Sequence, residues 1–95
     1  MKNFQEKLAE HRRSVDKLDA ILVYTLGERF KQTEKIGKLK AEAKIQATDH
    51  ERELVQVERL RKLSADANLD ADFAERLLKF IISEVVKNHN KIKSR

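Results

Sequence analysis

Three cationic side chains, Arg12, Arg29 and Lys40, lie along one uninterrupted stretch of helix-favouring sequence. Because an α-helix turns by about 100° per residue, Arg29 and Lys40, eleven residues apart, return to nearly the same face about 16 Å apart. Arg12 lies 17 residues before Arg29, roughly 25 Å along the helix axis, so it cannot reach the same ligand from within one chain. This arrangement predicts a binding site for a small dianion, to which Arg12 contributes, if at all, from a second chain.

A second charged group, Asp49, Arg52 and Glu53, falls within one helical turn. At positions i, i+3 and i+4 the three side chains share a helix face. The carboxylates there could accept a hydroxyl proton, and the guanidinium could hold them in place. A surface ion-pair trio has the same spacing, so the cluster alone leaves both interpretations open.

The two cations of the predicted anion site interrupt an apolar pattern. Arg29 and Lys40 occupy places where the apolar stripe would otherwise continue, and a buried cation needs an anionic partner. Long cationic side chains also extend from apolar surfaces into water, which is the competing explanation. His89 shares a predicted helix face with Ile82 and Val85, where a histidine hydrogen-bonded within the protein is the commoner case.

Several kinds of chemistry are disfavoured by what the sequence lacks. There is no cysteine, and therefore no disulfide, thiolate nucleophile or cysteine-bound metal. His11, His50 and His89 show no metal-binding spacing, and no glycine-rich phosphate loop or GxSxG motif occurs. We expect no metal, no cofactor and no covalent intermediate.

The elements that position these residues are predicted to be helices. The 95 residues include no proline and two glycines, and Leu, Glu, Lys, Arg and Ala are abundant. Apolar residues recur at spacings of mostly three, four or seven and predict one long helix over 4–43. The members of this stripe are Phe4, Leu8, Val15, Leu18, Leu22, Leu26, Phe30, Ile36, Leu39 and Ala43.

Two shorter helices are predicted after the long one. The second, over 48–65, begins at a capping box formed by Thr48 and Glu51. The third, over 70–90, is capped by Asp70. Its apolar side consists of Phe73, Leu77, Phe80, Ile81, Val85 and Ile92. We expect one all-α domain over residues 1–95.

The long helix needs a partner, because about 60 Å of helix exceeds the dimensions of a compact domain of this size. Gly27 and Gly37 within it each cost roughly 1 kcal/mol relative to alanine. Close approach of another helix or of a ligand would offset that cost, and the sequence does not decide between the two.

The net charge of +5 comes mostly from one end of the chain. Lys87, Lys91, Lys93 and Arg95 lie there without an acidic residue, as suits the C-terminus of a helix, although such a tail could also touch nucleic acid or membrane. No apolar run resembles a signal peptide or approaches the roughly 18 residues that span a membrane. We expect a cytoplasmic protein with neither a membrane nor nucleic acid as partner.

Taken together, the motifs resemble those of the small all-helical chorismate mutases. The resemblance spans nearly all of the chain and implies one very long, one short and one medium helix, interlocked with a second copy as a homodimer with two equivalent sites. It implies rearrangement of chorismate to prephenate in aromatic amino acid biosynthesis. It is carried by Arg12, Leu18-Asp19, Glu28-Arg29, Gly37-Lys38-Leu39-Lys40 and Asp49-His50-Glu51-Arg52-Glu53.

The resemblance also implies roles for the cations. Arg29 would bind one substrate carboxylate, and Arg12 from the partner subunit would bind the other. Lys40 would contact the ether oxygen and a carboxylate. His89 falls where such enzymes commonly present Gln or Glu to the ether oxygen, and we expect it to donate there.

At the other end of the substrate, the resemblance implies that Glu53, with Asp49, binds the ring hydroxyl. Arg52 would line that end and orient the acids. Val85 replaces a serine that assists a carboxylate in some relatives, so this chain is expected to make one contact fewer.

Two alternatives stay open. An isochorismate–pyruvate lyase of the same fold would use a similar clamp on a similar dianion, although Glu53 and Asp49 as hydroxyl contacts favour chorismate. A helical module that binds nucleic acid or protein would share the basic charge and the long helix. That module would not explain Arg29 and Lys40 on the apolar stripe.

Overall fold

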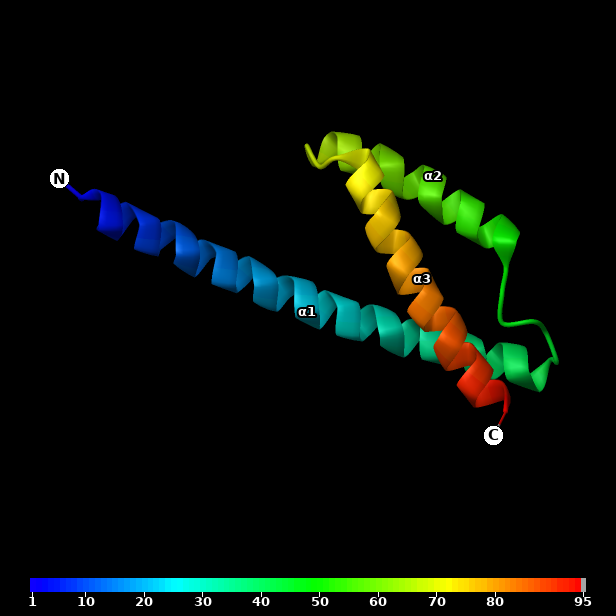
Figure 1. Ribbon diagram of the computed structural model, residues 1–95. Coiled ribbons are helices and arrows are strands. Elements are labelled where there is room, and N and C mark those ends of the chain that lie inside the picture. Colours follow the sequence, from blue (N-terminus) through cyan, green and yellow to red (C-terminus); the bar gives the residue numbers. More distant parts are fainter. Residues whose placement is uncertain (95) are drawn as a thin grey trace. The chain divides into compact units, whose positions relative to one another are not determined.

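The computed structural model describes residues 1–94 and contains three helices, α1 (Phe4–Glu42), α2 (His50–Asp66) and α3 (Ala71–Lys93) (Figure 1). No strand occurs among these residues. The predicted all-α fold with one long, one short and one medium helix is therefore confirmed. Arg95, the last cation of the basic tail, lies outside the described residues.

The chain divides into two compact units. One is Met1–Gln32, which contains the N-terminal part of α1, and the other begins at Thr33 and contains the last turns of α1 together with α2 and α3. Each unit is described by itself below. The single domain over 1–95 and the homodimer stay predictions.

Helix α1 ends in a backbone motif that the sequence does not announce. Lys44 has a positive φ of 58°, a conformation that glycine usually supplies at a helix C-terminus. The Ile45 N–H donates to the Lys40 carbonyl at 2.8 Å, and the Lys44 N–H donates to Ala41 at 3.2 Å. These bonds satisfy the last carbonyls of α1 and reverse the chain beside Lys40.

The predicted start of the second helix was wrong by two residues. Asp49, not Thr48, is the N-cap of α2: its backbone is extended, and its carboxylate accepts a hydrogen bond from the Arg52 N–H at 3.1 Å. The capping box of Thr48 and Glu51 does not form in this role. Aspartate caps at least as well as threonine, and its charge also favours the positive end of the helix.

A short connection joins α2 to α3. Asn68 adopts a positive φ of 54°, and the Leu69 N–H donates to the Ser64 carbonyl at 2.9 Å, which closes α2. Asp70 is the N-cap of α3, as predicted, and accepts from the Asp72 N–H at 3.0 Å. Helix α3 continues past residue 90 to Lys93 because nothing in its basic last turn stops it.

The buried face of α3 differs from the predicted one. Ala74 and Leu78 are the buried apolar residues, whereas Phe73, Leu77 and Phe80 are exposed in the single chain. Hydrophobicity alone predicts burial of the two phenylalanines, but Ala74 and Leu78, on the neighbouring stripe of the helix, are the buried residues. Two buried apolar residues are a small core for the part of the chain that the structure describes.

Helices α2 and α3 are also connected by an ion-pair network. Arg61 contacts Asp72 at 3.0 Å and Glu75 at 3.1 Å, and Lys79 contacts Glu75 at 3.0 Å. The hydrogen bond with Asp72 raises the pKa of Arg61, and that with Lys79 lowers the pKa of Glu75. The network fixes α3 against α2 on one side of the helix pair.

No helix in the described range is long and apolar enough to cross a membrane.

Candidate active site

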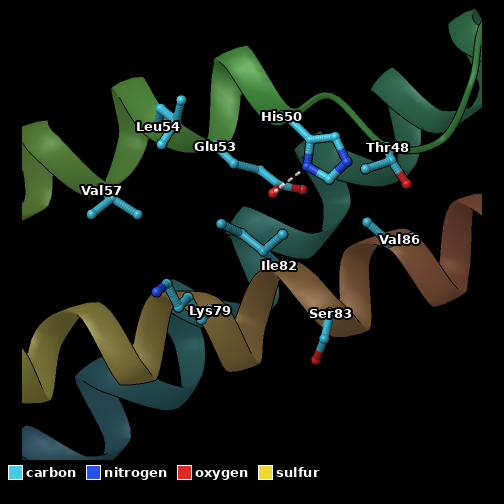
Figure 2. Close-up of a pocket in the computed structure, with 9 residues that line it drawn as sticks. All are labelled: Thr48, His50, Glu53, Leu54, Val57, Lys79, Ile82, Ser83 and Val86. Atoms are coloured by element: carbon cyan, nitrogen blue, oxygen red, sulfur yellow. Dashed lines mark ion pairs between the residues drawn. The ribbon is translucent and has the colours of Figure 1, made fainter.

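A pocket of about 550 Å³ lies between α2 and α3 within the second unit (Figure 2). Val57 from α2 and Ile82 from α3 both point into the space between the helices. Most of its wall is apolar, with ionisable groups on both helices. The lining residues are Thr48, His50, Glu53, Leu54, Val57, Lys79, Ile82, Ser83 and Val86. Such a pocket suits a small ligand with an apolar ring and a few polar groups.

Glu53 is the predicted site residue that lines this pocket. Its side chain is 28% exposed, and it lies in the first turn of α2, where the helix dipole favours a carboxylate. One carboxylate oxygen, Oε2, is 3.5 Å from Nδ1 of His50.

Asp49 and Arg52 lie at the same end of α2 as Glu53, but the hydrogen bonds of Asp49 go to backbone N–H groups. Asp49 Oδ1 accepts from the Arg52 backbone N–H, and the Asp49 carbonyl accepts from the Glu53 N–H at 3.0 Å. The residue Arg52 is exposed. Asp49 therefore fixes the first turn that presents Glu53, which is a contribution the charge cluster alone did not indicate.

Lys40 is half-buried in the last turn of α1. Its Nζ donates to the Ala47 carbonyl at 3.3 Å, across the reversal that follows α1. An ammonium group has three N–H donors, and this long bond to a neutral acceptor uses one of them. Lys40 is thus held in position while two of its donors stay open to an anion.

His89 is buried on α3, with 5% of its surface exposed. Its Nε2 is 2.7 Å from the Thr33 carbonyl, and because a carbonyl only accepts, Nε2 carries the proton and donates. Nδ1 is buried and has no hydrogen-bond partner. Val85, one turn earlier on the same helix, is half-buried.

The position of His89 explains Gly37. A Cβ at Gly37 would lie 2.5 Å from Cδ2 and 3.0 Å from Nε2 of His89, and 3.1 Å from Cδ1 of Ile92. Close approach of another helix is therefore what Gly37 permits. At Gly27 nothing lies within 4 Å of the same atom, so the reason for that glycine does not lie in this chain.

Arg12 and Arg29 belong to the first unit. Arg29 is half-buried, and its Nη1 is buried without a hydrogen-bond partner. Arg12 is exposed beside a surface hollow that Phe4, Leu8 and Asp16 help to line. Exposure in the single chain leaves Arg12 available to a second one.

The structure adds residues that sequence reasoning did not select. His50, Lys79, Ile82 and Val86 line the pocket with Glu53. The spacing of His50 and Glu53, at i and i+3, was the signal that could have identified the first of them. In the part of the chain that the structure describes, no group of three or more His, Asp or Glu residues could hold a metal ion.

The fold is all-helical, and its pocket between α2 and α3 is mainly apolar with a few polar and ionisable side chains. The sequence model of the chorismate mutase type II family matches residues 11–90. The chain therefore belongs to the chorismate mutase type II family, whose members are isomerases. A comparison with curated proteins found no match.

Proposed function

We propose that this chain converts chorismate to prephenate in aromatic amino acid biosynthesis. The reaction is a unimolecular rearrangement in which a C–O bond breaks as a C–C bond forms within one molecule. It needs no nucleophile and no obligatory proton transfer. The enzyme therefore has to select a reactive conformer and stabilise developing charge.

The observation that carries this proposal is a pair of buried nitrogens without hydrogen-bond partners. Among the described residues these are Nη1 of Arg29 and Nδ1 of His89. Burying a polar group without a partner costs free energy, so each nitrogen favours a ligand that supplies one. Nη1 of Arg29 is a donor and needs an acceptor such as a carboxylate, whereas Nδ1 of His89 accepts in the neutral ring and donates only in the imidazolium. Both belong to residues that the sequence predicts to contact the substrate.

The proposed cationic clamp acts on the two carboxylates of chorismate. Arg29 binds one of them, and Arg12 of the partner subunit binds the other. Guanidinium groups suit this role because they pair with carboxylates through two parallel hydrogen bonds. Holding both ends selects the compact conformer in which the bond-forming carbons meet, and such orientation can contribute several kcal/mol.

Lys40 and His89 act on the ether oxygen. Negative charge gathers on this oxygen as the C–O bond breaks, so donors placed there stabilise the transition state more than the ground state. The hydrogen bond from Lys40 to Ala47 keeps the ammonium in place before the substrate arrives, which limits the reorganisation needed during the reaction. Lys40 contributes most because its charge does not depend on a second proton.

Glu53 binds the ring hydroxyl of the substrate through its carboxylate, with Asp49 beside it. Arg52 lines this end of the site, and its positive charge offsets the negative charges of Asp49 and Glu53. The Val85 side chain cannot form a hydrogen bond, so the substrate carboxylate beside it is bound by the arginine clamp alone.

A homodimer is part of the proposal. Apolar residues of α1 are exposed in the single chain: Val15, Leu18, Ile21, Leu22, Val23 and Leu39 are each more than half exposed. A second copy of the chain would cover them and would bring Arg12 to the substrate. A cytoplasmic location stays a prediction.

The test offers chorismate and isochorismate separately to the purified protein, with prephenate and pyruvate measured as products. The proposal expects saturable formation of prephenate from chorismate and little pyruvate from isochorismate. Pyruvate formation with the higher kcat/KM would favour the lyase of the same fold.

A further inference from the structure

Among the residues that line the pocket, His50 lies within ion-pair distance of Glu53. Its Nδ1 is 3.5 Å from Oε2 of Glu53, and both side chains line the pocket between α2 and α3. Figure 2 shows the imidazole and the carboxylate pointing toward one another at the Thr48 end of this pocket. His50 has no role in the function proposed above.

The two partners differ in their contact with water. The His50 side chain is 85% exposed, whereas that of Glu53 is 28% exposed. An exposed ion pair contributes little to the free energy of folding, so we do not expect His50 to stabilise the fold appreciably. Removing His50 should therefore leave the fold intact and change mainly the carboxylate of Glu53.

The other charges near this pair are of both signs. Lys79 on α3 lines the same pocket, while Asp49 and Glu51 flank His50 in sequence. The contact of His50 with Oε2 of Glu53, at 3.5 Å, is the geometric observation on which a role for His50 rests.

We propose that His50 is a positioning residue: it holds Oε2 of Glu53 and thereby directs Oε1 to the hydroxyl of the substrate. This inference rests on the proposed function, in which Glu53 binds that hydroxyl. The hydroxyl takes no part in bond breaking. Its contact is equally strong in the ground and transition states, so losing it raises KM and leaves kcat nearly unchanged.

The experiment compares wild-type protein with His50→Ala, His50→Asn and Lys62→Ala. Asparagine places an amide N–H close to the position of Nδ1. Lys62→Ala is the matched control, because it removes another exposed ion pair of α2 at the same 3.5 Å separation, with Glu58, and neither residue lines the pocket.

We expect His50→Ala to raise KM about two- to five-fold with kcat within two-fold of wild type, which is the size of effect that exposed ion pairs show. His50→Asn should restore most of the loss, because its amide N–H takes the place of Nδ1. An unchanged KM in His50→Ala, or an equal rise in Lys62→Ala, would overturn the inference.

Glu53→Ala separates this inference from the function on which it rests, because alanine, unlike glutamine, leaves no oxygen to accept from the substrate hydroxyl. If Glu53→Ala binds chorismate as well as wild type, the proposed hydroxyl contact is wrong, and the role of His50 falls with it. If Glu53→Ala is impaired while His50→Ala is not, only the inference fails.

Discussion

His89 is held through one ring nitrogen, and this determines what the other can do. Nε2 donates its proton to the Thr33 carbonyl, so in the neutral ring Nδ1 is an acceptor. A hydrogen bond from Nδ1 to an ether oxygen requires a second proton on the ring. His89 can therefore donate to the ether oxygen only as the imidazolium, and Lys40 carries the larger share of that contact.

We predict that His89→Gln raises kcat, because it supplies the ether oxygen with an N–H donor that Nδ1 of the neutral imidazole lacks. The glutamine amide nitrogen carries two N–H groups, enough for both the Thr33 carbonyl and the substrate. His11→Ala, on an exposed part of α1, is the control and should keep the wild-type kcat. Steady-state kinetics measures both variants, and a folded His89→Gln protein with a lower kcat would contradict the role of His89.

The sequence indicated which residues to consider for the site, but it did not indicate the local role of each one. Arg29 and His89 were selected from the sequence, and each has a buried nitrogen without a partner. Asp49 was selected for its charge, but its use as the N-cap of α2 depends on competition with Thr48 one residue earlier. Two adjacent capping residues differ by a few tenths of a kcal/mol, which a sequence pattern does not resolve.

Gly37 controls how closely α3 approaches the last turns of α1 within the second unit. A methyl group there would meet a ring that is already fixed by its hydrogen bond to Thr33. Neither the ring nor the end of Ile92 can move without losing packing.

We predict that Gly37→Ala lowers the free energy of unfolding by about 1–2 kcal/mol, because overpacking outweighs the gain in helix propensity. It should also lower kcat by displacing His89. Chemical denaturation and steady-state kinetics measure the two effects. Gly27→Ala, where the added methyl meets nothing within 4 Å in this chain, is the control. A Gly37→Ala protein as stable as wild type would contradict the packing.

The helices themselves follow from the sequence more closely than their ends and faces. The absence of proline and the 3.6-residue periodicity were sufficient for three helices. The end of α1 was not predictable in detail, since Lys44 adopts a left-handed conformation that lysine rarely takes. The buried face of α3 was missed because Ala74 and Leu78 are covered although Phe73 and Phe80 are more hydrophobic.

The whole chain buries too little apolar surface to explain its composition. Ala74 and Leu78 are the buried apolar residues of the described chain, while the stripe of α1 is exposed. A sequence can predict this stripe but not what covers it, because intermolecular contacts leave the same periodic pattern as intramolecular ones. The exposed stripe and the exposed Arg12 both favour a composite site in a homodimer.

We predict that Arg12→Ala and Arg29→Ala are each inactive as homodimers but recover activity when mixed and refolded together. A mixed dimer contains one site that has both arginines, so a statistical mixture should regain up to about a quarter of wild-type activity by the symmetry of a two-fold dimer. Native mass spectrometry would verify subunit exchange. Exchange without recovery would show that Arg12 does not act on the partner's site.

The central claim is that Lys40 stabilises the charge on the ether oxygen of chorismate. The direct measurement is the rate of prephenate formation by wild type, Lys40→Ala and Lys38→Ala, without metal or cofactor. We predict saturable turnover by wild type, a loss of at least two orders of magnitude in kcat/KM for Lys40→Ala, as for an oxyanion donor, and little change for the exposed Lys38→Ala. Near-wild-type turnover by a folded Lys40→Ala protein, or none by folded wild type, would contradict the claim.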